Sequence, residues 1–182
     1  MLLGSFFKDS KGVWKYQTQE REDLKINICP FLRGPLSQWH PSPFRDPSLG
    51  LDFANAEQYM MLQKALAFGD QETAQKIMAT DSPSKAKSLG RKVKNYDDYV
   101  WDNKRCAVVL NGNMMKFSQN EDLKELLLAT GDCILVEGNP SDAVWGAKLS
   151  VEDPRILNPD KWMGQNLLGR VLMQVRSKLQ NA

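Results

Sequence analysis

Apolar residues near the C-terminus recur at the spacing of one buried helical face, at positions 167, 168, 171, 172 and 175. This pattern predicts a helix whose first turn includes Gly164 and Gly169. Both glycines are poor helix-interior residues, so we expect this turn to come very close to another backbone or to a ligand. Amides at a helix N-terminus are also a common place to bind phosphate or another anion. A packed helix with two small residues at a crossing point is the simpler alternative.

Further helices are predicted upstream from capping and termination signals. Asn55 and Gln58 form a capping box that opens a helix to about Phe68. Pro83 stands where a first-turn proline would, and Gly90 where a terminating glycine would, so a short helix is expected over 83–89. The remaining helices are predicted from about Asp70 to Ala79, from about Asp97 to Lys116 and from Asn120 to Ala129.

Strand signals are fewer. The apolar run Cys133–Glu137, bounded by glycines at 131 and 138, is the clearest strand, and Lys25–Phe31 predicts a short strand that ends at Pro30. The segment 31–47 holds four prolines, so we expect neither a regular helix nor a central strand there. It is either a binding loop or an irregular cover over the core.

The predicted fold class is α+β, a helix-rich single domain with a small β-sheet. Residues 1–24 alternate aromatic and charged side chains and are expected to form an N-terminal extension or a hairpin of the same domain, which otherwise spans 25–182. The chain shows no internal repeat, no P-loop and no dinucleotide-binding glycine fingerprint. At 182 residues it is long enough to bury a core without disulfide staples.

Charge and composition narrow the function classes. The chain carries 24 basic and 22 acidic residues, a net charge of +2, so any polyanion site must be local. Three widely spaced cysteines are typical of buried thiols in a reducing compartment. No signal peptide, membrane span or lipidation motif is apparent, so we expect a soluble cytoplasmic protein.

The histidine content excludes several mechanisms. With His40 as the single histidine and no Cys-x-x-Cys pair, a zinc site of the usual ligands is impossible, and a Ser-His-Asp triad would depend on this one residue. Chemistry, if present, falls to carboxylates, lysines or arginines. No metal and no cofactor are expected.

Two carboxylates are the candidate catalytic residues. Glu57 lies in the first turn of a predicted helix, where the macrodipole favours its ionised form, and an irregular loop bearing aromatic and arginine residues leads into that turn. An acidic residue in the first turn also stabilises a helix, so Glu57 has a purely structural explanation as well. Asp142 follows the strand directly and precedes Trp145-Gly146. A turn-capping aspartate is the equally available account.

Two further side chains are candidate substrate contacts. Trp101, on the long predicted helix, could stack on a flat heterocycle or simply belong to the core. Lys64 lies on the same helical face as Glu57 at i+7, where it could bind a phosphate or remain solvated.

In sequence order these pieces resemble the YbiA-like N-glycosidases, also called the NADAR family. The motifs that carry the resemblance are Phe31 to Phe44, Glu57-Gln58-Tyr59 with Lys64, Trp101, Asp142 to Gly146, and Gly164 to Arg176. Together they cover roughly residues 25 to 179. Gln38 stands where the family usually has Asn after Ser37, and Ala147-Lys148 replaces a smaller continuation after Gly146. Both departures affect substrate identity more than reaction type.

The resemblance implies hydrolysis of a C–N glycosidic bond in a phosphoribosyl or ADP-ribosyl compound. The substrate would be a ribosylamino-pyrimidine intermediate of riboflavin synthesis or ADP-ribosylated guanine, and ADP-ribosylated DNA is a further candidate. Glu57 and Asp142 would be catalytic, because carboxylates stabilise the oxocarbenium character of such a reaction or handle its protons. The resemblance also implies these substrate contacts: Arg33, Ser37, Trp39, Phe44, Tyr59, Lys64, Trp101, Trp145, Gly146, Gly164, Asn166 and Gly169.

Two other readings of the same motifs remain open. The pocket could bind ADP-ribose or NAD without cleaving it, as a non-catalytic sensor module, because fold resemblance alone does not prove turnover. A structural protein with an inherited empty pocket would bind neither.

Overall fold

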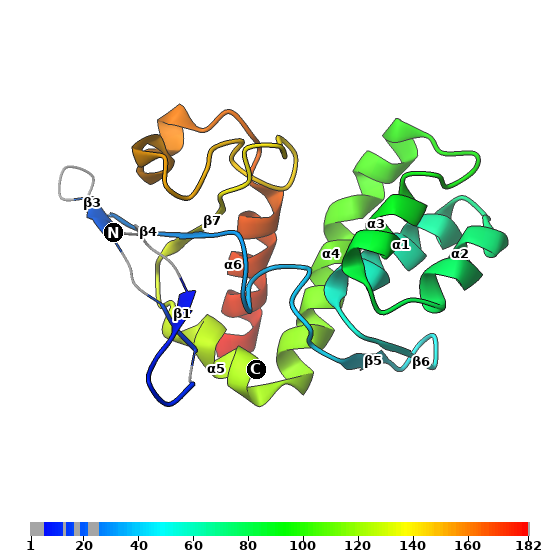
Figure 1. The fold of residues 1–182 in the computed structure, drawn as a ribbon, viewed down its shortest axis with the longest axis horizontal. Helices are drawn as coiled ribbons and strands as arrows, with labels where there is room; N and C mark the ends of the chain where they lie inside the picture. Colours follow the sequence, from blue (N-terminus) through cyan, green and yellow to red (C-terminus); the bar gives the residue numbers. More distant parts are fainter. Residues whose placement is uncertain (1–5, 13, 17–18, 22–25, 182) are drawn as a thin grey trace. The chain divides into compact units, whose positions relative to one another are not determined.

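The computed structural model describes residues 6–12, 14–16, 19–21 and 26–181. The described residues group into two compact units (Figure 1). Unit 1 combines the N-terminal part, up to Ser37, with the C-terminal part from Asp122 onward, and unit 2 is the continuous segment Gln38–Glu121. The fold class is the predicted one, helix-rich α+β with small sheets. The assignment of residues 1–24 and 25–182 to one domain stays a prediction.

Unit 1 is built around a three-stranded sheet of order β3-β4-β7. Strand β4 (Ile26–Phe31) pairs antiparallel with β3 (Gln19–Arg21) and parallel with β7 (Ile134–Glu137), with Ile28 opposite Ile134. Pro30 lies inside β4, which therefore runs one residue past its predicted end. Among the residues that the structure describes, β3 pairs with residues 26–28 and not with Pro30, a position where the missing N–H of a proline is tolerated.

The remaining elements of unit 1 surround this sheet. Strands β1 (Phe6–Lys8) and β2 (Trp14–Tyr16) form a separate antiparallel pair. Helix α5 (Glu121–Ala129) precedes β7, and helix α6 (Leu167–Gln180) packs against β7. Two 3₁₀ turns, η1 (Pro154–Leu157) and η2 (Pro159–Lys161), lie between β7 and α6. The buried core of the sheet is formed by Ile28, Val136, Ala147, Leu149 and Ile156.

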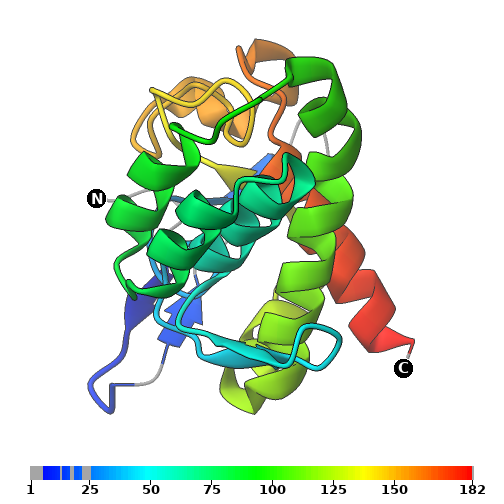
Figure 2. The ribbon, with the colours of Figure 1, turned by 90° about the vertical axis from the view of Figure 1, so that its right-hand side faces the viewer.

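Unit 2 is helical apart from one hairpin. Strands β5 (Phe44–Asp46) and β6 (Leu51–Phe53) pair antiparallel. Helix α1 packs against the other three helices, and Figure 2 shows this group. The helices are α1 (Ala56–Ala67), α2 (Gln71–Met78), α3 (Pro83–Gly90) and α4 (Asp98–Gln119).

Side-chain caps fix where these helices begin. Asn55 Oδ1 accepts from the Gln58 N–H at 2.9 Å, and Asp70 Oδ1 accepts from the Thr73 N–H at 3.1 Å. Asp97 caps α4 in the same way, accepting from the Val100 N–H at 2.8 Å. These caps satisfy amides that would otherwise lack partners, which is why the predicted starts agree with the observed ones.

Two sequence expectations need correction, and one short strand was not foreseen. The proline-rich segment contains β5, a strand of a two-stranded hairpin and not a central strand, which the prolines at 41, 43 and 47 flank rather than interrupt. The C-terminal helix begins at Leu167, three residues after Gly164. Of the three cysteines, Cys29 and Cys133 are buried as expected, but Cys106 is exposed on α4. Within the described ranges, no helix is long and apolar enough to cross a membrane.

Candidate active site

Glu57 lies in the first turn of α1 in unit 2, and its side chain is buried, with the residue 5% exposed. Its N–H donates to the Gln38 main-chain oxygen at 3.1 Å. The Asn55 cap immediately before it fixes the helix start, so the positive end of the α1 dipole acts on the Glu57 carboxylate. The residue is thus rigidly held at a helix end, as a catalytic carboxylate must be.

Gln38 is a residue that sequence reasoning missed as a support for Glu57. Besides accepting from the Glu57 N–H, it accepts through Oε1 from Asn113 Nδ2 of α4 at 2.8 Å. Its Nε2 donates to Met60 Sδ at 3.9 Å. Gln38, which stands where the family usually has Asn, therefore makes these contacts inside unit 2. No local signal could have found it, because Asn113 is 75 residues away in the chain.

The structure brings together two predicted substrate contacts, Lys64 and Trp101. Lys64 Nζ lies 5.9 Å from the Trp101 ring and 4.0 Å from the centroid of the Tyr96 ring. Burial lowers the pKa of Lys64, and the nearby Arg91 charge lowers it further, while Asp98 opposes both effects. Trp101 is 5% exposed. A partly desolvated ammonium beside aromatic rings is suited to binding an anionic group.

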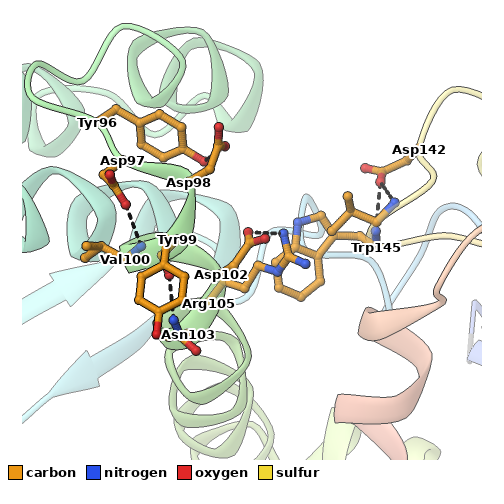
Figure 3. Close-up of polar contacts among 11 residues, drawn as sticks. Tyr96, Asp97, Asp98, Tyr99, Val100, Asp102, Asn103, Arg105, Asp142 and Trp145 are labelled. Atoms are coloured by element: carbon orange, nitrogen blue, oxygen red, sulfur yellow. Dashed lines mark hydrogen bonds and ion pairs between the residues drawn. The ribbon is translucent and has the colours of Figure 1, made fainter.

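The N-terminal turns of α4 add polar groups to this face (Figure 3). Tyr96 donates through its hydroxyl to Asp98 Oδ1 at 2.9 Å, and burial with this bond raises the pKa of Tyr96 to about 12. Arg105 Nη1 donates to Asp102 Oδ1 at 2.5 Å. Tyr96 and Arg105 were not predicted as site residues. Neither gave a local signal, because Tyr96 lies before the start of α4 and an arginine on a helix is ordinarily solvated.

Asp142 lies in unit 1, in the turn that follows β7. Its Oδ1 accepts from the N–H groups of Val144 at 2.9 Å and Trp145 at 2.8 Å (Figure 3). This is the turn-capping arrangement that the sequence left open as an alternative. It engages one carboxylate oxygen and leaves Oδ2 as the oxygen able to face a substrate. A shared site for Asp142 and Glu57 stays a prediction.

The segment around Gly164 has the backbone packing that the sequence left open as the simpler alternative to anion binding. The N–H groups of residues 165, 166, 167 and 168 donate to the carbonyls of residues 143, 146, 144 and 145, so these amides are already paired. A Cβ on Gly164 would overlap the Gly146 main-chain oxygen. The close approach that the glycine predicted is therefore to another backbone.

Asn166 and Gly169 hold the start of α6 close to β7 and form the α6–β7 contact. Asn166, which is 1% exposed, donates through Nδ2 to the Leu135 carbonyl at 2.9 Å and accepts through Oδ1 from the Glu137 N–H at 3.0 Å. A Cβ on Gly169 would overlap the Leu135 main-chain oxygen. Both polar atoms of the Asn166 side chain thus help to hold α6 to the strand, and a contact of Asn166 with substrate stays a prediction.

The other predicted contacts divide between surface and core. Arg33 is exposed and Ser37 is buried in unit 1, while Trp145 is partly buried and Gly146 is buried. Trp39, in unit 2, is 43% exposed, and Lys87 Nζ lies 5.8 Å from its ring. Their contacts with substrate stay predictions.

Phe44 and Tyr59 belong to a buried aromatic cluster in unit 2. The ring centroids of Phe44 and Phe53 are 5.5 Å apart, and the Tyr59 ring lies 5.8 Å from Phe44 and 5.1 Å from Phe53. Burial raises the pKa of Tyr59 to about 12, with the Asp46 charge adding to the effect. Packing of β5 and β6 on α1 accounts for both residues.

Comparison with known proteins identifies the family. The NADAR domain model matches residues 31–180. An N-glycosidase of Acanthamoeba polyphaga mimivirus is 45% identical over 147 residues, which are 79% of this chain and 86% of that protein. A riboflavin biosynthesis protein of Vibrio vulnificus is 32% identical over 72% of this chain, which spans 32% of that protein.

The structural comparison agrees with the family match. The N-glycosidase YbiA of Escherichia coli is 30% identical over 71% of this chain and 72% of its own length. The NMR structure of YbiA matches with a TM-score of 0.69 at 28% identity, covering 85% of each chain. The fold and the matched sequence define an enzyme of the N-glycosidase class. The chain belongs to the NADAR family, and its fold is that of YbiA.

Proposed function

We propose that this N-glycosidase hydrolyses the C–N bond between a phosphorylated ribose and a base-like leaving group. A ribosylamino-pyrimidine phosphate of riboflavin synthesis is the favoured substrate, because relatives in Vibrio vulnificus and maize are riboflavin biosynthesis proteins. The observation that carries the proposal lies on α1. The buried Glu57 and the partly desolvated Lys64 lie on one helical face, separated by about 10 Å of axial rise. That spacing leaves room for a sugar between a carboxylate and a phosphate-binding ammonium.

The chemistry needs only carboxylates and water. As the C–N bond breaks, its electron pair goes to the leaving nitrogen and positive charge builds at the anomeric carbon, which an ionised Glu57 stabilises. Water adds to that carbon and loses one proton, and the leaving nitrogen gains one, so the products are the phosphorylated sugar and the free amine. We assign Asp142 to orient the water or move its proton. Trp101 and Trp145 are the proposed walls for the base.

The direct test is product formation. The protein is incubated with a ribosylamino-pyrimidine phosphate and, separately, with ADP-ribosylated guanine, and released base is measured by mass. Glu57→Gln should lose at least about a hundredfold in kcat with its melting temperature retained. Glu125→Gln, on the exposed face of α5, is the matched control and should keep full activity. Full activity of Glu57→Gln would remove Glu57 from the mechanism.

Asp142→Asn separates the two accounts of Asp142. The Asn side-chain oxygen can still accept from the N–H groups of Val144 and Trp145, so the turn and the melting temperature should be retained. Loss of the ionisable carboxyl should nevertheless lower kcat by about a hundredfold if Asp142 handles a proton. Unchanged kcat would leave Asp142 as a turn cap alone.

The substrate outcomes are also distinct. Release of guanine from the ADP-ribosylated compound alone would assign the ADP-ribosyl class in place of the favoured one. Binding of ADP-ribose with no product from either compound would contradict the proposal and favour a sensor.

A further inference from the structure

Arg105 is a buried cation that the catalytic proposal does not use. It follows Trp101 by one turn of α4, so the two side chains share a helix face. The Arg105 side chain is 15% exposed, whereas its partner Asp102 is 51% exposed. Asp102 accepts from Nη1 at 2.5 Å, as Figure 3 shows. The guanidinium is therefore held from one side only.

The Nε of Arg105 is buried and has no hydrogen-bond partner in the described part of the chain. A buried donor left in this state destabilises the fold, and more so when it belongs to a charged group. Packing alone would favour an apolar side chain at this position. The Nε–Nη2 edge of an arginine presents two parallel N–H groups, a geometry that matches the oxygens of a phosphate or carboxylate.

The surroundings of Arg105 favour an anion. Lys64 Nζ lies 4.0 Å from the Tyr96 ring centroid, and the charges of Asp102 and Arg105 both act on the Tyr96 hydroxyl. Arg91 acts on Lys64 in turn. Lys64 and Arg105 therefore both lie near Tyr96, and Arg91 lies near Lys64, against two carboxylates, Asp98 and Asp102. One of those, Asp102, is already paired with Arg105.

We propose that Arg105 binds the phosphate of the substrate through its Nε edge, with Asp102 as the positioning residue that fixes the guanidinium. Arg105 then completes the phosphate contact that Lys64 makes from α1, and the preference for a phosphorylated sugar over a plain one needs both cations. This inference rests on the proposed function for the identity of the ligand. The amides before α6, which the sequence offered as one possible anion site, are already paired.

Binding of ribose 5-phosphate and of ribose, measured by calorimetry, tests the proposal without turnover. The wild-type protein should bind ribose 5-phosphate at least about tenfold more tightly than ribose, the effect of one charged hydrogen bond. Arg105→Gln should remove that preference while leaving ribose binding unchanged. Lys104→Gln, an exposed neighbour on the same helix, is the matched control and should keep the preference.

Two further variants guard against a folding defect. Arg105→Lys keeps the charge but not the paired donors, so its affinity for ribose 5-phosphate should be intermediate. Asp102→Asn leaves Arg105 in place but loosens it, and should weaken ribose 5-phosphate binding with little change in melting temperature. Wild-type affinity for ribose 5-phosphate in Arg105→Gln, or a wild-type protein with no preference for it, would overturn the proposal.

The outcome is independent of the hydrolysis test. Loss of phosphate preference in Arg105→Gln, in a protein that releases no base from either compound, would support the phosphate site and contradict the proposed function. Release of base by the wild-type protein, with an Arg105→Gln variant of unchanged KM, would support the function and contradict the phosphate site.

Discussion

The α6–β7 contact in unit 1 and the α1–α4 face in unit 2 differ in how completely their buried polar groups are hydrogen-bonded. Around α6, both polar atoms of Asn166 and the amides of residues 165–168 are paired with nearby backbone. On α4, Arg105 keeps a buried donor without a partner, and on α1 the pKa of Lys64 is lowered by burial. The fully paired region holds the fold together, and the incompletely paired region is poised to bind.

The largest effect is expected from Gly169→Ala at the α6–β7 contact. The new Cβ would overlap the Leu135 main-chain oxygen, which cannot rotate away as a flexible side chain could. Helix and strand would have to separate, at a cost of about 3 kcal/mol. Chemical denaturation should show this loss. Gly131→Ala tests the opposite case, because nothing lies within 4 Å of its Cβ, and it should show only the strain of a φ of 54°. Equal free energies of unfolding for Gly169→Ala and the wild type would contradict the close approach of α6 to β7 at this position.

A smaller, pH-dependent effect is expected from Lys116→Met. Lys116 is fully buried on α4, and burial lowers its pKa to about 7 from the 10.5 of an ordinary lysine. Between these two values the unfolded chain binds more protons than the folded one, so Lys116 makes stability rise with pH. Below pH 7 both states are protonated and its contribution is constant.

Lys116→Met should remove that rise, which is at most about 1.4 kcal/mol for each pH unit. The measurement is urea denaturation at intervals from pH 7 to pH 8. Wild type and variant carry the same three cysteines, whose unfolded pKa is about 8.5, so the thiols contribute equally to the two slopes that are compared. Lys104→Met, at an exposed position on the same helix, should keep the wild-type slope. The same slope in Lys116→Met would show that Lys116 is protonated throughout the folded state.

The smallest change in stability is expected from Lys64→Met, which should instead change binding. It removes the ammonium beside the Tyr96 ring, worth about 0.5–1 kcal/mol, but also removes the desolvation that lowers the Lys64 pKa. The two effects offset, so the free energy of unfolding should hardly change. KM for the phosphorylated substrate should rise, while Lys85→Met on the exposed side of α3 leaves it unaltered. A Lys64→Met protein with a lowered free energy of unfolding and an unchanged KM would contradict this prediction, because Lys64 would then stabilise the fold and not bind substrate.

Local signals predicted the helices well because caps and breakers act within a few residues. Asn55, Asp70 and Asp97 each accept from an amide three residues later, and each was visible as a helix start. The hairpin β5–β6 was missed because its pairing places Phe44 against Phe53 across the turn, in a segment whose prolines argued only against a regular helix or a central strand. The strand survives because the prolines flank it.

The candidate site was harder to predict because its geometry depends on distant residues. Gly164 and Gly169 correctly signalled a close approach, but the sequence could not say whether to a ligand or to backbone, and both approach backbone. The support of Glu57 by Gln38 and Asn113 joins residues 75 positions apart. Arg105 gave no signal of its own, since an arginine on a helix is ordinarily solvated, and only its burial marks it.

The parallel pairing of β4 with β7 has a consequence for how the chain folds during synthesis. Ile28 and Ile134 are adjacent in the sheet, yet the ribosome makes the second more than a hundred residues after the first. Unit 2 is one continuous stretch, Gln38–Glu121, and is complete before β7 exists. The nascent β4 therefore remains without its parallel partner while unit 2 forms, and α6, which packs against β7, is translated after that strand.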